Sequence, residues 1–265
     1  MTTVIILTKA YNNSQVKQIE NTLKSLLEGL NVETKILSPA TNEWVQVAIQ
    51  GEDENIAVNY VTKKIGTCPS SMESVEKFST LKGYITNPNQ SKEKLLVDIG
   101  ISKPNTIFAN IPLSHLQAQL VDGRKTSLEK ITDLFALCDN LPINVKITRI
   151  DSKESLMEAE FSASQIRKYE AWQESLLDRL LVIGASEHEI ERTLRYTGLD
   201  RDVISVETLG MFEHSLTCKL GTDATGLIWK IGKMLKNSKL SVFRPRRIDE
   251  FIEQPQTQPT TNTNN

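Results

Sequence analysis

The residues with the clearest chemical character lie near the end of the chain, between Leu216 and Arg247. This segment has eight basic side chains against one acid, Asp223, and therefore a net charge of +7. The basic residues are Lys219, Lys230, Lys233, Lys236, Lys239, Arg244, Arg246 and Arg247. Because the whole chain has a net charge of −2, the remainder carries −9. Lysine and arginine bind phosphate oxygens, so this asymmetry predicts a surface that binds nucleic acid.

A turn within this segment, Gly221-Thr222-Asp223, could add backbone contacts to a phosphate. It joins a predicted strand to a predicted helix over 223–235, for which Thr222 or Asp223 is the expected N-cap. Free N–H groups and the positive end of the helix dipole then point out of the turn. The turn is not a P-loop, because the lysine and hydroxyl pair is missing, and its glycine spacing excludes a dinucleotide fingerprint. An ordinary capped helix is the alternative.

The predicted helix is amphipathic, which decides where its lysines point. Leu227, Ile228 and Ile231 fall on one stripe at helical spacing. We therefore expect Lys230, Lys233 and Lys236 on the exposed side, either as phosphate contacts or as a solvated face.

Side chains for catalysis or metal binding do not form a recognisable pattern. The histidines and cysteines are far apart in the sequence, at His115, His188, His214, Cys68, Cys138 and Cys218. We find no zinc-ligand spacing and no hydrolase, metalloprotease or carboxylate-cluster motif. We therefore predict a protein that is not an enzyme and has no metal or cofactor. A nuclease or transferase site assembled from distant residues is the alternative.

The hydrophobic pattern predicts an α+β protein in three modules. Residues 1–66 are expected to form a ferredoxin-like βαββα layer with strands 3–8, 32–37 and 44–50 and helices 13–28 and 52–65. Residues 67–74 look like a polar linker. The next module, 75–161, has predicted strands 81–86, 94–99, 106–111, 142–150 and 155–161, with a helix over 127–138. Five short strands with a helix before the fourth indicate an OB-type barrel.

Residues 162–250 are expected to form a C-terminal αββαβ module with the basic edge. The predicted helices cover 162–182, 187–196 and 223–235, and the predicted strands cover 203–209, 214–220 and 240–243. Pro245 is expected to end the ordered chain, and residues 251–265 are expected to be a disordered tail.

Four segments of the barrel resemble the strands of an S1 RNA-binding domain. They are Leu81–Ile85, Leu96–Gly100, Ala109–Leu116 and Val145–Asp151. The resemblance implies an OB fold and RNA contact through aromatic side chains. Leu95, Leu96 and Pro112 depart from the family pattern in the region that contacts RNA. Tyr84 and Phe108 are then the candidates for base stacking.

Over its whole length the chain resembles an archaeal family of unknown function, domain of unknown function 2110. The segments that carry the resemblance are Gly51–Glu54, Ile111–Leu113, Asp139–Pro142, Cys218–Asp223 and Phe243–Arg247. It implies an archaeal source and brings no assigned activity.

These observations together predict a non-enzymatic RNA-binding protein that acts in translation, RNA processing or transcription. RNA is the expected partner, with ribosome or RNA polymerase components as further candidates. The alternatives are a protein-interaction adaptor and a ligand-sensing module, since Asp223–Ile228 resembles the turn of ACT regulatory domains. The chain has no signal-like or membrane-spanning run, so we expect a cytoplasmic protein and no membrane partner.

Overall fold

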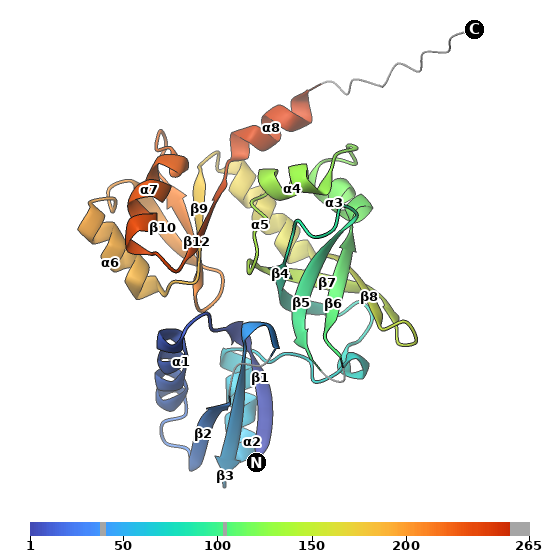
Figure 1. The fold of residues 1–265 in the computed structure, drawn as a ribbon, viewed down its shortest axis with the longest axis vertical. Helices are drawn as coiled ribbons and strands as arrows, with labels where there is room; N and C mark the ends of the chain where they lie inside the picture. The colour runs from blue at the N-terminus through green and yellow to red at the C-terminus, as the bar shows by residue number, and fades with distance from the viewer. Residues whose placement is uncertain (38–40, 103–104, 255–265) are drawn as a thin grey trace.

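Three α+β modules follow one another along the chain (Figure 1). The computed structural model describes residues 1–37, 41–102 and 105–254. In Figure 1 the N-terminal module is blue, the barrel is mainly green, and the C-terminal module is yellow to red.

The N-terminal module is a three-stranded antiparallel sheet with two helices. Its elements are β1 (Thr2–Lys9), α1 (Asn13–Leu26), β2 (Val32–Leu37), β3 (Trp44–Gly51) and α2 (Glu54–Lys64). The strand order is β1-β3-β2. The apolar stripes of both helices pack on the sheet, with Ile19 and Leu23 of α1 and Val61 of α2 in one buried core.

The polar segment 67–74 is packed against its neighbours instead of forming a free linker. Thr67 pairs with Ile6 of β1 in an isolated bridge, and the Cys68 amide donates to the Ile5 carbonyl at 2.8 Å. Met72 is buried in the barrel core. Serine and proline in the sequence indicated a linker, but backbone contacts attach this segment to the N-terminal module and the Met72 side chain attaches it to the barrel.

The central module is a closed five-stranded barrel, consistent with an OB-type barrel. Its strands are β4 (Thr80–Thr86), β5 (Lys94–Ile101), β6 (Ile107–Pro112), β7 (Pro142–Asp151) and β8 (Leu156–Phe161), in the order β4-β5-β6-β8-β7. The β6 and β8 strands run parallel, whereas the other neighbouring pairs of these strands are antiparallel. The helices are α4 (Leu128–Leu134), which the sequence predicted, and α3 (Leu113–Leu120), which it did not.

The C-terminal module differs from the predicted αββαβ order because a strand stands where the end of a helix was expected. Its elements are α5 (Ala163–Glu174), β9 (Arg179–Ile183), α6 (Glu187–Thr197), β10 (Val203–Thr208), β11 (Glu213–Cys218), α7 (Ala224–Met234), β12 (Lys239–Phe243) and α8 (Pro245–Glu253). The strands form one antiparallel sheet in the order β10-β11-β9-β12. The predicted helix over 162–182 is therefore wrong beyond Glu174.

Burial on both faces explains why the sequence of β9 suggested a helix. Leu180 and Val182 pack under α6 and α7, whereas Leu181 and Ile183 belong to the core shared with the barrel. All four side chains are consequently apolar, and such a run lacks the alternation that marks a half-exposed strand.

Pro245 begins the last helix, α8, instead of ending the ordered chain. Proline is well suited to the first position of a helix, where its missing N–H leaves no hydrogen bond unmade. Ile248 is buried, and Phe251 and Ile252 pack against the barrel core. The expected disordered tail is thus wrong for residues 251–253. Gln254 follows the helix as a bend, and the rest of that tail, 255–265, lies outside the described residues.

Phe78, just before β4, is an exposed aromatic residue in a left-handed backbone conformation, with φ of 70°. Its side chain is 61 % exposed. A bulky residue in this region stores about 1–3 kcal/mol of strain. We expect Phe78→Gly to raise the free energy of unfolding by roughly 1 kcal/mol, because glycine adopts positive φ without this cost. Urea denaturation tests this. Phe78→Leu is the matched control and should show no gain; a less stable glycine variant would contradict the prediction.

Candidate nucleic-acid interface

A hollow of about 310 Å³ brings together residues from the two ends of the basic segment 216–247. Its wall contains the Gly221–Asp223 turn and four cations, Lys219, Arg244, Arg246 and Arg247. The sheet topology explains why these residues lie close together. Strands β11 and β12 flank β9 on opposite sides, and both run antiparallel to it. The turn after β11 and the start of α8 after β12 therefore lie at the same end of the sheet. The prediction that these residues act together thus has a geometric basis.

Asp223 occupies the start of α7 with its own carboxylate. Its side chain accepts a hydrogen bond from the Thr225 amide at 3.0 Å. The Arg244 guanidinium lies 3.6 Å from the same carboxylate oxygen, Oδ1, and donates to the Thr225 hydroxyl. The Thr225 hydrogen bonds, with a smaller contribution from Arg244, hold the pKa of Asp223 below its usual value. The carboxylate would repel a phosphate at the helix start, which favours the neighbouring cations over the turn's N–H groups as candidate anion contacts.

The cations of the basic segment differ in how far they are already paired. Lys239 lies 2.5 Å from Asp139 and Arg247 lies 2.7 Å from Asp133. Lys219 and Arg246 are exposed, and within residues 1–37, 41–102 and 105–254 they have no ion-pair partner. These two side chains can bind a phosphate without first losing a carboxylate.

The three predicted lysines are all exposed, as expected: Lys230 and Lys233 lie on α7, and Lys236 lies in the turn just after it. The helix also carries Trp229, which the sequence analysis did not single out. Its indole is 69 % exposed, and the Lys233 ammonium lies 3.3 Å from the ring centroid. The spacing of four residues between Trp229 and Lys233 was the signal that could have paired them.

Tyr84 is not available for base stacking, which corrects the prediction from the S1 resemblance. Its side chain is completely buried, and its ring packs edge-on against Trp44 with centroids 5.2 Å apart. The Tyr84 hydroxyl donates to Glu213 at 3.4 Å. Phe108, on β6, is half-buried. The barrel face that the S1 resemblance assigned to RNA therefore offers at most one partly accessible ring from the two predicted residues.

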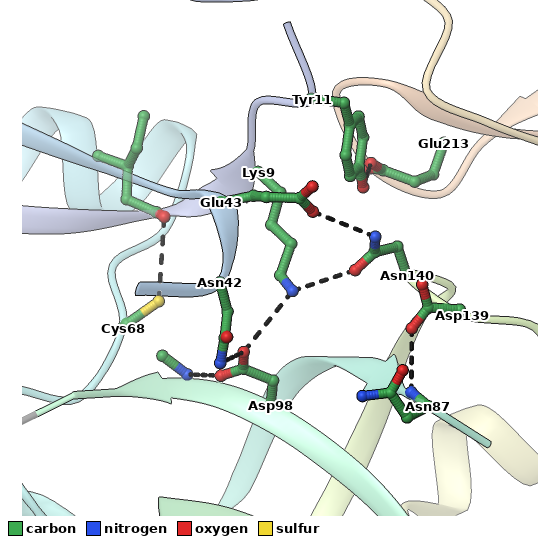
Figure 2. A network of polar contacts seen from close by, with 12 residues as sticks. Lys9, Tyr11, Asn42, Glu43, Cys68, Asn87, Asp98, Asp139, Asn140 and Glu213 are labelled. Atoms are coloured by element: carbon green, nitrogen blue, oxygen red, sulfur yellow. Dashed lines mark hydrogen bonds and ion pairs between the residues drawn. The ribbon is translucent and has the colours of Figure 1, made fainter. Parts of the chain in front are cut away.

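A buried polar network joins the N-terminal module to the barrel (Figure 2). The Lys9 ammonium lies 3.6 Å from the Asp98 carboxylate and donates to the Asn140 side-chain oxygen at 3.1 Å. Lys9 is also over the rings of Trp44 and Tyr84. Asp98 accepts further hydrogen bonds from Asn42 and the Gly100 amide, both at 3.0 Å. These contacts of Lys9 and Asp98 hold the two modules together.

Glu213 connects the C-terminal module to the same region. It accepts a hydrogen bond from the Tyr11 hydroxyl at 2.6 Å, and Figure 2 shows the Tyr11 ring directed at its carboxylate. Burial raises the pKa of Glu213 to about 7 although the hydrogen bond from Tyr11 opposes the shift. A perturbed carboxyl is common in active sites, but Glu213 does not line any of the described hollows.

Another hollow, of about 770 Å³, has acidic residues in its wall. Glu129, Asp133 and Asp139 are among its lining residues, together with the loop Asn87–Gln90. Arg247 and Lys239, the cations next to these acids, are already paired with Asp133 and Asp139, so this hollow is a weaker candidate for a nucleic-acid site than the basic one. Among the described residues, no group of three or more metal-ligating side chains is arranged to hold a metal ion. Nor does that part of the chain contain a helix long and apolar enough to cross a membrane.

Comparison with protein families assigns the chain along nearly its whole length. The DUF2110 N-terminal domain matches residues 3–71, the central domain matches 75–173, and the C-terminal domain matches 177–243. The chain belongs to the DUF2110 family. In this DUF2110 protein the central match includes α5 with the barrel, in agreement with the packing of Tyr169 and Trp172 of α5 in the barrel core.

Solved structures resemble this DUF2110 protein only distantly. An uncharacterized protein of Methanocaldococcus jannaschii is 11 % identical, with a TM-score of 0.23, over 34 % of this chain and 95 % of that one. A Pyrococcus horikoshii complex of a/eIF2alpha, aDim2p and rRNA gives 10 % identity and a TM-score of 0.26, over 48 % and 62 %. A Thermus thermophilus protein gives 10 % and 0.17, over 95 % and 42 %. The comparison with curated proteins gave no match.

Proposed function

We propose that this protein is a non-enzymatic RNA-binding protein that holds the RNA backbone with its C-terminal module. The observation that carries the proposal is the basic hollow, where Lys219, Arg244, Arg246 and Arg247 converge from two separate segments. Phosphate contacts supply most of the affinity of such surfaces and little sequence preference. We further propose translation, RNA processing or transcription as the setting, with ribosome or RNA polymerase components as additional partners.

The charge distribution supports a single binding face for RNA instead of non-specific binding over the whole surface. The segment 216–247 carries +7, whereas the rest of the chain carries −9. A polyanion is attracted to the basic side and repelled by the remainder, so it should approach in one orientation. Lys230 and Lys233 extend the positive surface from the hollow along α7, and Lys236 continues it just beyond the end of the helix.

The barrel and the N-terminal module then serve mainly as a support for this face. We interpret the barrel as S1-like in fold, because its strand order and the parallel pair of β6 and β8 match an OB-type barrel. We interpret the N-terminal module as ferredoxin-like, since β1-β3-β2 is an antiparallel sheet built from a βαββα unit. With Tyr84 buried, RNA contact shifts from the barrel to the C-terminal module.

Removing the two unpaired cations of the hollow tests the proposed function. We expect the double variant Lys219→Ala with Arg246→Ala to bind a 12-nucleotide single-stranded RNA roughly tenfold more weakly at moderate salt. The slope of log affinity against log salt should fall by about 1.4, since each lost phosphate contact on a single strand contributes about 0.7. Fluorescence anisotropy over a series of salt concentrations measures both. RNAs of unrelated sequence should be affected equally.

The matched control removes two charges elsewhere. Lys35 on β2 and Lys63 on α2 are exposed and, among the described residues, unpaired, so their double alanine variant has the same net charge as the test variant. It should bind RNA almost as wild type does. An equal loss of RNA affinity in both variants would show that the effect comes from overall net charge, and it would contradict a binding site in the hollow. Wild-type protein without salt-dependent RNA binding would favour the adaptor or the ligand-sensing module instead.

A further inference from the structure

The positive surface formed by the basic hollow and α7 carries an aromatic ring, Trp229, that does not pack into the core. Trp44 and Trp172 are 2 % and 4 % exposed and belong to the interior, whereas Trp229 is 69 % exposed on α7. An isolated exposed apolar residue is ordinary. This one is surrounded by exposed lysines, with Lys230 next to it and Lys233 over its ring.

Trp229 lies in line with the basic hollow. Thr225, Trp229 and Lys233 are spaced four residues apart and therefore share one side of α7, each about 6 Å further along the axis. Arg244 of the hollow donates a hydrogen bond to the Thr225 hydroxyl. An RNA strand that leaves the hollow along this side of α7 would next reach the Trp229 indole, with the Lys233 ammonium immediately beside it.

Gly226 keeps the approach to the indole open. A Cβ atom at this position would have only one neighbour within 4 Å, an Asp223 side-chain oxygen at 3.8 Å. The interior packing thus does not require a glycine here, and alanine would favour the helix. Because Gly226 precedes Trp229 by three residues, the missing side chain leaves the helix surface beside the ring bare.

We propose that Trp229 stacks on an unpaired base of single-stranded RNA whose phosphates bind Lys233 and the basic hollow. The inference rests on the proposed function and names the form of RNA that the surface accepts. Every unpaired base has a π face that can stack on an indole, with little sequence preference. Bases inside a duplex are stacked on one another and cannot reach the ring. The adjacent cations favour a polyanion over an apolar protein segment as the occupant.

The test compares two substitutions at one position against two RNAs. Trp229→Leu should weaken binding of a 12-nucleotide oligouridine about tenfold, because stacking is lost while an apolar side chain remains. Trp229→Phe keeps a ring and should recover most of that loss. Binding of a 12-base-pair RNA duplex should be the same for all three proteins. Tyr196→Leu, which removes another exposed ring, on α6, is the control and should bind as wild type.

Tryptophan fluorescence gives an independent readout, since Trp229 is the accessible indole of the three. Oligouridine should quench wild-type emission, and Trp229→Leu should abolish the quenching. Unchanged oligouridine affinity in Trp229→Leu, or an equal loss for duplex, would overturn the stacking proposal. If Lys219→Ala with Arg246→Ala still weakens binding in that case, the proposed function stands without it. If the wild-type protein binds neither the oligouridine nor the duplex, the proposed function itself is contradicted.

Discussion

Replacing Lys9 by methionine is expected to lower the free energy of unfolding by about 3–5 kcal/mol, the cost of leaving one member of a buried ion pair alone. Lys9 and Asp98 are 2 % and 1 % exposed, so water cannot replace the lost ammonium. Methionine keeps most of the apolar stem beside Trp44 but supplies no charge. Urea denaturation of wild type and variant measures the difference.

Two further variants separate the buried charge from simple loss of contacts. Adding Asp98→Asn to Lys9→Met removes the stranded carboxylate, while asparagine can still accept from the Gly100 amide, so the double variant should regain a large part of the loss. Lys24→Met breaks an exposed pair with Glu20 on α1 and should cost less than about 1 kcal/mol. A cost for Lys9→Met as small as that for Lys24→Met would contradict a structural role for the network.

The elements that follow local rules could be predicted from the sequence, and Lys9 shows where such rules end. The barrel strands β6 and β8 alternate between buried and less buried positions, so their period is visible in the residues themselves. Lys9 ends β1, and a charged residue at a strand end normally indicates solvent. Its burial depends on Asp98 and Asn140, which are brought to it only by the packing of two modules.

The candidate site was predictable in composition but not in geometry. Counting charges was enough to locate the basic segment, because lysine and arginine are scarcely ever buried without partners. It could not distinguish Lys239, which pairs with Asp139 across a hundred residues of sequence, from Lys219, which is unpaired among the described residues. The prediction that Tyr84 stacks on bases was wrong for a different reason. The S1 pattern places this residue on a strand, but a ring in a small barrel can equally pack in the core.

The stability of the protein should fall between pH 5 and pH 8 because of Glu213. Burial raises the pKa of this carboxyl from 4.5 to about 7 in the folded chain. The folded state therefore holds a proton that the unfolded state has released. The contribution is fully present below pH 4.5 and is lost as the pH rises through 7. Because a tenfold change in an ionisation constant corresponds to about 1.4 kcal/mol, the loss amounts to about 3 kcal/mol.

Glu213→Gln isolates this contribution, because glutamine has nearly the same shape, stays neutral and can still accept from Tyr11. Unfolding free energies of both proteins should be measured in urea from about pH 4.5 to about pH 8.5. The value for wild type minus that for the variant should decline by about 3 kcal/mol over this range, since all other titrations cancel in the difference. Tyr11→Phe removes the hydrogen bond that favours the ionised carboxyl, so in that background the decline should move to higher pH. A difference that stays constant with pH would show that Glu213 ionises normally, with Tyr11 and Tyr84 stabilising its charge well enough to offset the burial.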